Sequence, residues 1–351
     1  MTAKMLRSLP PQPDGVVWPT REWPRREAGA PSTLTSLVDE MFTETSRYAA
    51  TYAVVVVHAG AIVAERYGAA LPQWDGGEHP VDATTPLLSW SMAKSVLHAS
   101  VGVLVGRGML ELESTAPVRA WQAPDDPRAA ITLDQLLTMR DGLDFVEDYI
   151  DGTSNVIDML FGEGTDDVAG YAAARSLAHP PGSVFNYSSG TSNIVARIVG
   201  DVVAATGGDV RAFLRDDLFA PIGMASADPR CDAAGTFVGS SYVYATAQDF
   251  ARFGYLYLRD GVWDDRRLLP SGWVDHARRV RSHDATDGTA YGAHWWVAED
   301  ALGGFWASGY EGQSILIVPA LDLVVVRLGR TDASLGPNLR AWRNRVTTAF
   351  I

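Results

Sequence analysis

Residues 87–97 read Leu-Leu-Ser-Trp-Ser-Met-Ala-Lys-Ser-Val-Leu, so that Ser91 and Lys94 lie three positions apart within an apolar segment. The helical pattern continues to Arg107 and ends at Gly108. Residues i and i+3 of a helix share one face, about 5–6 Å apart at Cβ. At the helix start, free N–H groups and the helix dipole favour a developing negative charge on Ser91. A lysine desolvated by the core can lose its proton near neutral pH. The segment therefore predicts a nucleophile, Ser91, with Lys94 as its base.

Lysine usage supports this interpretation. Of the 29 basic residues only two are lysine, Lys4 and Lys94, and arginine provides the other positive charges. Unlike arginine, lysine can be neutral when it is desolvated. A helix cap followed by a surface lysine is the plain alternative, because a four-residue pattern with two fixed positions also arises by chance.

Composition limits the partners and the location of the protein. Of the 351 residues, 47% are hydrophobic and 20% are charged, as in ordinary globular proteins. The net charge of −13 makes nucleic acids and anionic membrane surfaces poor partners. A single cysteine, Cys231, excludes an internal disulfide and fits a reducing compartment. We find neither the apolar run of a signal peptide in residues 1–19 nor a stretch of roughly 20 apolar residues that could span a membrane. We expect a cytoplasmic protein without membrane contacts.

Strand patterns lie near both ends of the sequence, and helical patterns lie between them. Residues 52–58 and 61–67 resemble a hairpin, and further strands are predicted at 294–297, 304–307, 313–318 and 323–328. Helices are predicted at 34–47, 91–107, 132–139, 192–206, 210–218, 246–259 and 339–350. This order predicts an α+β fold, in which one antiparallel sheet is built from both termini, is flanked by helices and carries an inserted, mainly helical lobe. The expected parts are an extended arm (1–32) and one domain (33–351), with a sheet lobe from about 33–85 and 290–351 and a helical lobe within about 86–290.

Several motifs in this order resemble the class C β-lactamase and penicillin-binding-protein superfamily of serine hydrolases. They are Ser91-Met92-Ala93-Lys94-Ser95, Ile131 to Met139, Asp141-Gly142-Leu143 and Phe185-Asn186-Tyr187-Ser188-Ser189. The resemblance extends from roughly Tyr52 to Leu328 and implies a β-lactamase/transpeptidase-like fold. Three further segments are most similar to the branch of family VIII esterases and 6-aminohexanoate-dimer hydrolases: Glu147 to Asp151, His294-Trp295-Trp296 and Gly309-Tyr310-Glu311-Gly312-Gln313.

The resemblance implies roles for particular residues. Tyr187 is expected beside Ser91 and Lys94 as a proton relay, and the backbone N–H groups of Ser91 and Tyr310 as the oxyanion hole. The residues that it implies as substrate contacts are Tyr149, Trp296, Ser189, Ser308 and Gly309. For Tyr149 and Trp296, plain packing is an equally good interpretation. We interpret Glu311 as a solvated turn residue.

Two departures from the family pattern bear on the substrate. Ser189 occupies the position of an asparagine in β-lactamases, and Ala307-Ser308-Gly309 replaces their Lys-Thr-Gly triplet. That lysine normally helps to hold the substrate carboxylate, so its loss argues against efficient β-lactam chemistry.

The sequence therefore predicts a serine hydrolase that acts on small carboxylic esters or amides through an acyl-enzyme. The alternatives are an amidase for linear oligoamides of the 6-aminohexanoate-dimer type, a weak β-lactamase, and a non-catalytic acyl-binding module on the same fold. No cofactor or metal is expected, because metal-ligand spacings and phosphate-binding glycine loops are missing from the sequence. The expected partner is a small-molecule ester or amide, and the arm leaves a homodimer possible.

Overall fold

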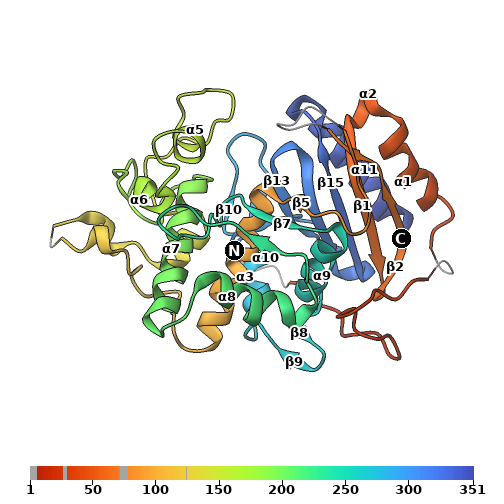
Figure 1. The fold of residues 1–351 in the computed structure, drawn as a ribbon, viewed down its shortest axis with the longest axis horizontal. Coiled ribbons are helices and arrows are strands. Elements are labelled where there is room, and N and C mark those ends of the chain that lie inside the picture. Colours follow the sequence, from red (N-terminus) through yellow and green to blue (C-terminus); the bar gives the residue numbers. More distant parts are fainter. Residues whose placement is uncertain (1–5, 27–29, 72–77, 124) are drawn as a thin grey trace.

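An eight-stranded antiparallel sheet is the central element of the computed structural model (Figure 1). The structure describes residues 6–26, 30–71, 78–123 and 125–351. In order across the sheet, the strands are β10 (Ser282–His283), β11 (Ala290–Tyr291), β12 (Trp296–Val297), β13 (Phe305–Gly309), β14 (Gln313–Val318), β15 (Leu323–Arg330), β1 (Ala50–His58) and β2 (Ala61–Tyr67). Strand β1 pairs with β15, so the predicted sheet built from both ends of the sequence is confirmed.

The sheet is covered by helices on both faces, as Figure 1 shows. Val55 and Val57 of β1 point into a core that contains α9 (Ala247–Leu258). Val54 and Val56 point the other way, into a core under α1 (Leu34–Thr43) and α11 (Gly336–Ala349). Because successive side chains of a strand alternate between faces, a sheet covered on both sides requires a continuous apolar strand. The unbroken valine run of β1 has this property.

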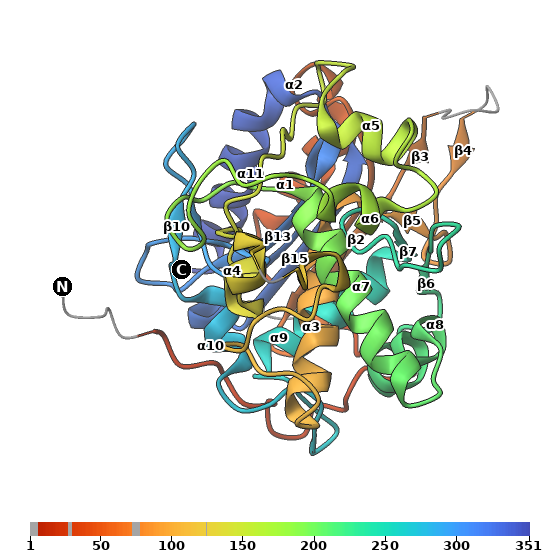
Figure 2. The same ribbon diagram turned by 90° about the vertical axis from the view of Figure 1, so that its left-hand side faces the viewer.

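The remaining helices form the part of the molecule away from this sheet. Helix α3 (Ala93–Gly106) is buried along nearly its whole length and contacts α7 (Ser189–Ala205), as Figure 2 shows. Gly102 allows Trp273 to approach α3, because a Cβ at this position would lie 2.4 Å from the indole Nε1. The other helices of this part are α4 (Leu133–Leu137), α5 (Asn155–Phe161), α6 (Val168–Ala173), α8 (Val210–Phe213) and α10 (Trp273–Arg278). The short α2 (Thr45–Tyr48) instead lies beside α1 and α11 at the sheet (Figure 1).

Three small sheets accompany the eight-stranded sheet among the described residues. Strand β5 (Leu87–Leu88) pairs with β7 (Val243–Ala245), and β7 pairs with β6 (Asp228–Pro229). Two further pairs are β3 (Ala69–Ala70) with β4 (His79–Pro80), and β8 (Val262–Trp263) with β9 (Arg266–Arg267). Strand β5 leads directly into the segment that carries Ser91 and so fixes where that segment begins.

The structure corrects several predicted helix boundaries. The helix predicted over 34–47 is divided into α1 and α2 at Glu44, whose backbone is not helical. The helix predicted over 192–206 begins three residues earlier, because the Ser188 hydroxyl caps it by accepting from the Thr191 N–H at 2.9 Å. The helix predicted over 210–218 is only one turn of α-helix, followed by a π-helical segment over Leu214–Phe219.

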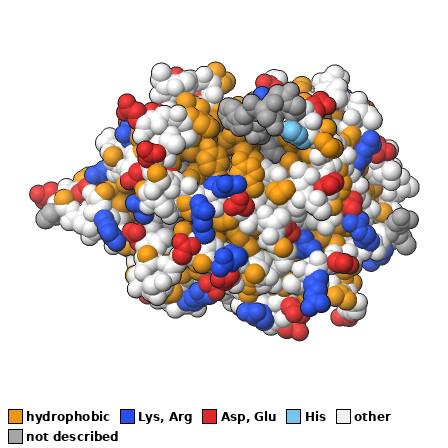
Figure 3. All heavy atoms as spheres, in the orientation of Figure 1, with side chains coloured by type: hydrophobic (Ala, Val, Ile, Leu, Met, Phe, Trp, Pro, Cys, Tyr) orange, Lys and Arg blue, Asp and Glu red, His pale blue; other side chains and the backbone are white. Residues whose placement is uncertain are grey.

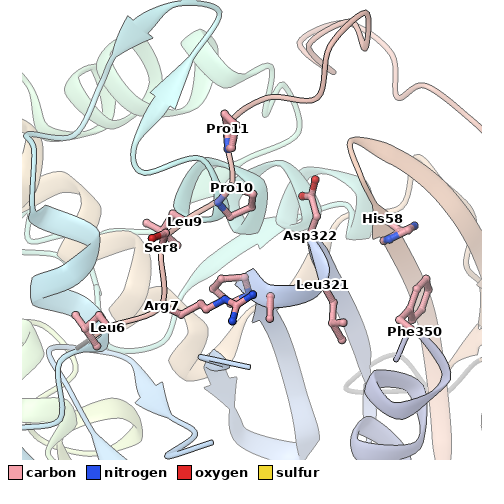
Figure 4. Close-up of a pocket in the computed structure, with 12 residues that line it drawn as sticks. Leu6, Arg7, Ser8, Leu9, Pro10, Pro11, His58, Leu321, Asp322 and Phe350 are labelled. Carbon is pink, nitrogen blue, oxygen red and sulfur yellow. The ribbon is translucent and has the colours of Figure 1, made fainter. Parts of the chain in front are cut away.

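The arm lies against its own domain over residues 6–26. Trp23 is buried, and its ring packs edge-on against Tyr255 with 5.6 Å between centroids. Three buried arginines of the domain donate hydrogen bonds to arm carbonyls: Arg252 to Pro19 (2.7 Å), Arg259 to Pro10 (3.2 Å) and Arg278 to Arg7 (2.5 Å). Figure 4 shows the start of the arm beside an open depression of about 900 Å³, which His58 and Phe350 also line.

We expect Trp23→Ala to lower the free energy of unfolding by about 3–5 kcal/mol, because it empties a buried site between the arm and α9. Urea denaturation followed by circular dichroism measures this change. Val17→Ala is the matched control, since Val17 lies on the same arm with 75% of its surface exposed. Equal stability of the two variants would contradict the view that the arm is part of the folded domain.

Candidate active site

Ser91 lies in a short 3-10 turn, Trp90–Met92, directly before α3. Trp90 has a φ of +46°, a left-handed conformation that is unusual for a large side chain and requires support from its surroundings. Ser89 gives part of that support: its buried hydroxyl donates to the Ser241 carbonyl at 3.2 Å and accepts from the Val243 N–H at 3.1 Å. The turn that presents Ser91 is therefore anchored to β7.

Lys94 is completely buried and directs its ammonium group at Ser91. The three donors of Nζ are all used, each at 3.0 Å: to Ser91 Oγ, Ser189 Oγ and the Ser240 carbonyl. Burial lowers the pKa of Lys94 to about 8, although the negative charge of Glu147 opposes this shift. A lysine in this environment exchanges a proton readily near neutral pH. The structure thus brings together the two residues that the sequence placed one turn apart.

Tyr187 lies beside this pair. Its ring centroid is 4.9 Å from Lys94 Nζ, and its hydroxyl lies close enough to the Ser91 side chain to be affected by it. Burial, followed by the charge of Glu147, raises the pKa of Tyr187 above its ordinary value. The phenol is therefore neutral across the pH range in which Lys94 titrates. The ring also stacks on Trp296, with 5.5 Å between centroids.

Glu147 is a site residue that the sequence analysis missed, since it was noted only as part of a loop. Its carboxylate accepts from the Ser189 backbone N–H at 2.8 Å, from the Ser189 hydroxyl at 2.6 Å and from the Tyr149 hydroxyl at 3.1 Å. One hydroxyl group thus separates the carboxylate from Lys94. The one available signal was a carboxylate in the segment Glu147 to Asp151, which resembles the esterase and 6-aminohexanoate-dimer hydrolase branch. That resemblance gave no indication of the contact with Ser189.

Ser189 lies beneath the lysine. It is fully buried at the first position of α7, and its hydroxyl accepts from Lys94 while it donates to Glu147. The prediction placed Ser189 among the substrate contacts. In the structure its side chain lies between Lys94 and Glu147 and hydrogen-bonds to both, and its contact with a substrate stays a prediction.

The last residue of strand β13, Gly309, contacts the Trp90–Met92 turn that carries Ser91. A Cβ at this position would lie 2.4 Å from the Ser89 carbonyl oxygen, so a glycine is required for this approach. Tyr310 follows, and its ring packs edge-on against Trp90 with 5.5 Å between centroids. Tyr149 stacks on the other side of Tyr310 at 4.8 Å. The proposed oxyanion residues Ser91 and Tyr310 therefore belong to two turns in contact.

A cavity of about 840 Å³ opens beside these aromatic rings. It lies between the loop Glu147–Ile150, the end of β13, and residues of β15 and α11. Of the predicted substrate contacts, Tyr149, Ser308 and Gly309 line it, whereas Trp296 lies against Tyr187.

The interpretation of Glu311 as a solvated turn residue is wrong in one respect. Glu311 does lie in a turn, with φ of +60°, but its side chain is only 21% exposed. Its carboxylate pairs with Arg330 Nε at 3.0 Å, and Glu311 lines a common cavity with Trp90, whose side chain opposes the rise that burial causes in the pKa of the carboxyl group. The Glu311 carboxylate therefore faces the Trp90–Met92 turn.

A neutral histidine lies near Lys94. The buried His294 ring contacts the Leu137 carbonyl through Nδ1 (2.8 Å) and the Ser192 hydroxyl through Nε2 (3.1 Å). Burial lowers the pKa of His294 to about 3. Its ring therefore adds no positive charge beside the lysine at neutral pH.

Acidic and basic side chains are interspersed over the face in Figure 3. Within the described residues, no three histidine, cysteine or carboxylate side chains are grouped so that they could hold a metal ion. Over that same part of the chain, no helix combines the length and apolar character needed to cross a membrane.

Known proteins share this fold and sequence pattern. The model of the Beta-lactamase family matches residues 38–350. The 6-aminohexanoate-dimer hydrolase of Paenarthrobacter ureafaciens is 27% identical over 93% of this chain and 86% of its own. A Bacillus anthracis protein proposed to be a 6-aminohexanoate-dimer hydrolase superposes with a TM-score of 0.74 (22% identity; 97% and 90% covered). A family VIII carboxylesterase superposes with a TM-score of 0.71 (14% identity; 91% and 98% covered).

The family match spans almost the entire domain and includes the buried lysine and its serine. The two solved structures support the fold alone, because their sequence identities are low. The curated hydrolase adds a sequence relationship over most of both chains. The chain therefore belongs to the β-lactamase family and is a serine hydrolase.

Proposed function

We propose that the protein hydrolyses small carboxylic esters by a two-step acyl transfer at Ser91. The observation that carries the proposal is the 3.0 Å contact of Ser91 Oγ with a buried lysine whose pKa is about 8. In the first step Ser91 Oγ attacks the substrate carbonyl, and neutral Lys94 takes the hydroxyl proton. Collapse of the tetrahedral intermediate breaks the ester bond and leaves the acyl group on Ser91.

Tyr187 completes the proton path. Its hydroxyl lies at Ser91 and is neutral, so it can donate a proton to the leaving alcohol and recover one from Lys94. In the second step the same pair removes a proton from water, which attacks the acyl carbonyl and releases the acid. The backbone N–H groups of Ser91 and Tyr310 hold the oxyanion in both steps.

The proposed substrate class is based on the relatives and on one residue that differs from β-lactamases. Linear oligoamides are the second candidate substrates, because a relative that matches over most of both chains is a 6-aminohexanoate-dimer hydrolase. Esters come first because their leaving groups are better. Ala307 stands where β-lactamases have the lysine of their Lys-Thr-Gly triplet, so we expect little β-lactam hydrolysis. The cytoplasmic location, the homodimer, and the division into arm, sheet lobe and helical lobe stay predictions.

Steady-state hydrolysis of p-nitrophenyl acetate and butyrate tests the assignment of the nucleophile and base. We expect Ser91→Ala and Lys94→Ala each to lower kcat by on the order of 10³-fold or more, because the two residues act as one unit. Ser36→Ala, at an exposed position on α1 away from this cavity, is the control. Nitrocefin, measured in parallel, reports any β-lactamase activity. Wild-type turnover by a folded Ser91→Ala variant would show that the nucleophile assignment is wrong. A burst of Ser91 acylation without steady-state turnover would instead favour an acyl-binding module.

The pH dependence of kcat/KM tests the role of Lys94 as the base. Since the neutral amine is the active form, we expect kcat/KM to rise with pH through an apparent pKa of about 8. The charge of Glu147 raises the pKa of Lys94, so its removal must lower that pKa. Glu147→Gln, which keeps an oxygen for Ser189, should therefore move the inflection to lower pH. An unchanged or alkaline-shifted inflection would show that Lys94 is not the titrating base.

A further inference from the structure

Two strained turns meet at the proposed oxyanion hole. Trp90, with φ of +46°, directly precedes Ser91, and Glu311, with φ of +60°, directly follows Tyr310. Left-handed backbone at residues other than glycine costs about 1–3 kcal/mol and persists only where neighbouring contacts impose it. Each turn thus orients a peptide group of the oxyanion hole, and each depends on external support.

One carboxylate connects the two turns. Glu311 pairs with Arg330 Nε at 3.0 Å and lines a common cavity with Trp90, whose side chain is close enough to affect the carboxylate. The Trp90 ring also rests edge-on against Tyr310, the neighbour of Glu311. The contact at Gly309, where β13 meets the Ser89 carbonyl, sets how close the turns approach. Glu311 then fixes how they are oriented relative to each other.

Polar side chains donate hydrogen bonds to the backbone carbonyls of the second turn, Tyr310–Gly312. The guanidinium of the buried Arg327 donates to the carbonyls of Glu311 (3.1 Å) and Gly312 (3.2 Å). The Gln313 side chain donates to the Tyr310 carbonyl at 3.0 Å. Every carbonyl from Tyr310 to Gly312 therefore has a donor, and the turn has little freedom to rotate.

Two glycines make room for this guanidinium. A Cβ on Gly312 would lie 2.9 Å from one of its nitrogens, and a Cβ on Gly329 would lie 2.6 Å from the other. A buried guanidinium is expensive unless its donors are satisfied, and here both terminal nitrogens of Arg327 have acceptors while Nε has none within the described part of the chain.

We infer that Glu311 is a positioning residue of the oxyanion hole, which acts through Trp90 on the Ser91 peptide and through its own turn on the Tyr310 peptide. This inference rests on the proposed acyl transfer at Ser91. Oxyanion donors must lie 2.7–3.1 Å from the charged oxygen, and small misplacements are costly. Loss of the carboxylate leaves both donors present but lets the two turns move apart.

The experiment compares Glu311→Ala, Glu311→Gln and Glu44→Gln. Glu44 forms an exposed pair with Arg47 on α2 and is the matched control. We expect Glu311→Ala to lower kcat for p-nitrophenyl butyrate on the order of 10- to 100-fold, with KM nearly unchanged. Butylboronic acid, whose adduct with the serine mimics the oxyanion, should lose affinity in parallel. Glu311→Gln keeps an acceptor beside Trp90 and should recover most of kcat, and Glu44→Gln should match the wild type.

Three outcomes separate the explanations. If Glu311→Ala lowers the melting temperature but keeps kcat and boronate affinity, the carboxylate is only a structural pair and the inference fails. If Glu311→Ala does not fold, Trp90→Phe removes the indole N–H beside the carboxylate while it keeps a ring against Tyr310, and an unaltered kcat there overturns the inference equally. If the wild type itself neither hydrolyses the ester nor reacts with a fluorophosphonate at Ser91, the proposed function fails rather than the role of Glu311.

Discussion

The burial of Lys94 is the constraint on which the rest of the site depends. Its ammonium group is held by two hydroxyls and a carbonyl, and the Glu147 carboxylate lies one hydroxyl further away. A carboxylate in direct contact would keep the lysine protonated, because an opposite charge stabilises the charged form. At this greater separation the charge of Glu147 compensates only part of the desolvation. The pKa of Lys94 thus stays near 8, where the amine can act as a base.

This arrangement explains why the fold brings distant segments together at one point. The three oxygens around Lys94 come from the turn before α3, from the first residue of α7 and from the segment before β7. The loop with Glu147 closes over α7, and β13 approaches along Gly309. Each segment is held by backbone contacts of its own. The site is therefore rigid before a substrate arrives, as electrostatic stabilisation of a transition state requires.

The sequence was sufficient for those features that depend on local geometry. The spacing of Ser91 and Lys94 is a property of one helical turn, and the strand patterns near both ends specify the sheet. Glu147 and Ser189 are 42 positions apart, and their contact depends on the path of an irregular loop, which hydrophobic periodicity does not encode. For Glu311, the backbone conformation turns the carboxylate toward Trp90, and residue type alone gives no sign of that direction.

The same burial moves the pKa values of Lys94 and Tyr187 in opposite directions, and this assigns their roles. Desolvation disfavours the charged form of each group, so it lowers the pKa of the lysine and raises that of the tyrosine. The state in which both groups are neutral is therefore the favoured one just above the lysine pKa. A tyrosinate base would have to form against this field, with the charge of Glu147 adding to its cost. In the proposed mechanism Lys94 is therefore the group that accepts the serine proton, and Tyr187 transfers protons without carrying charge between steps.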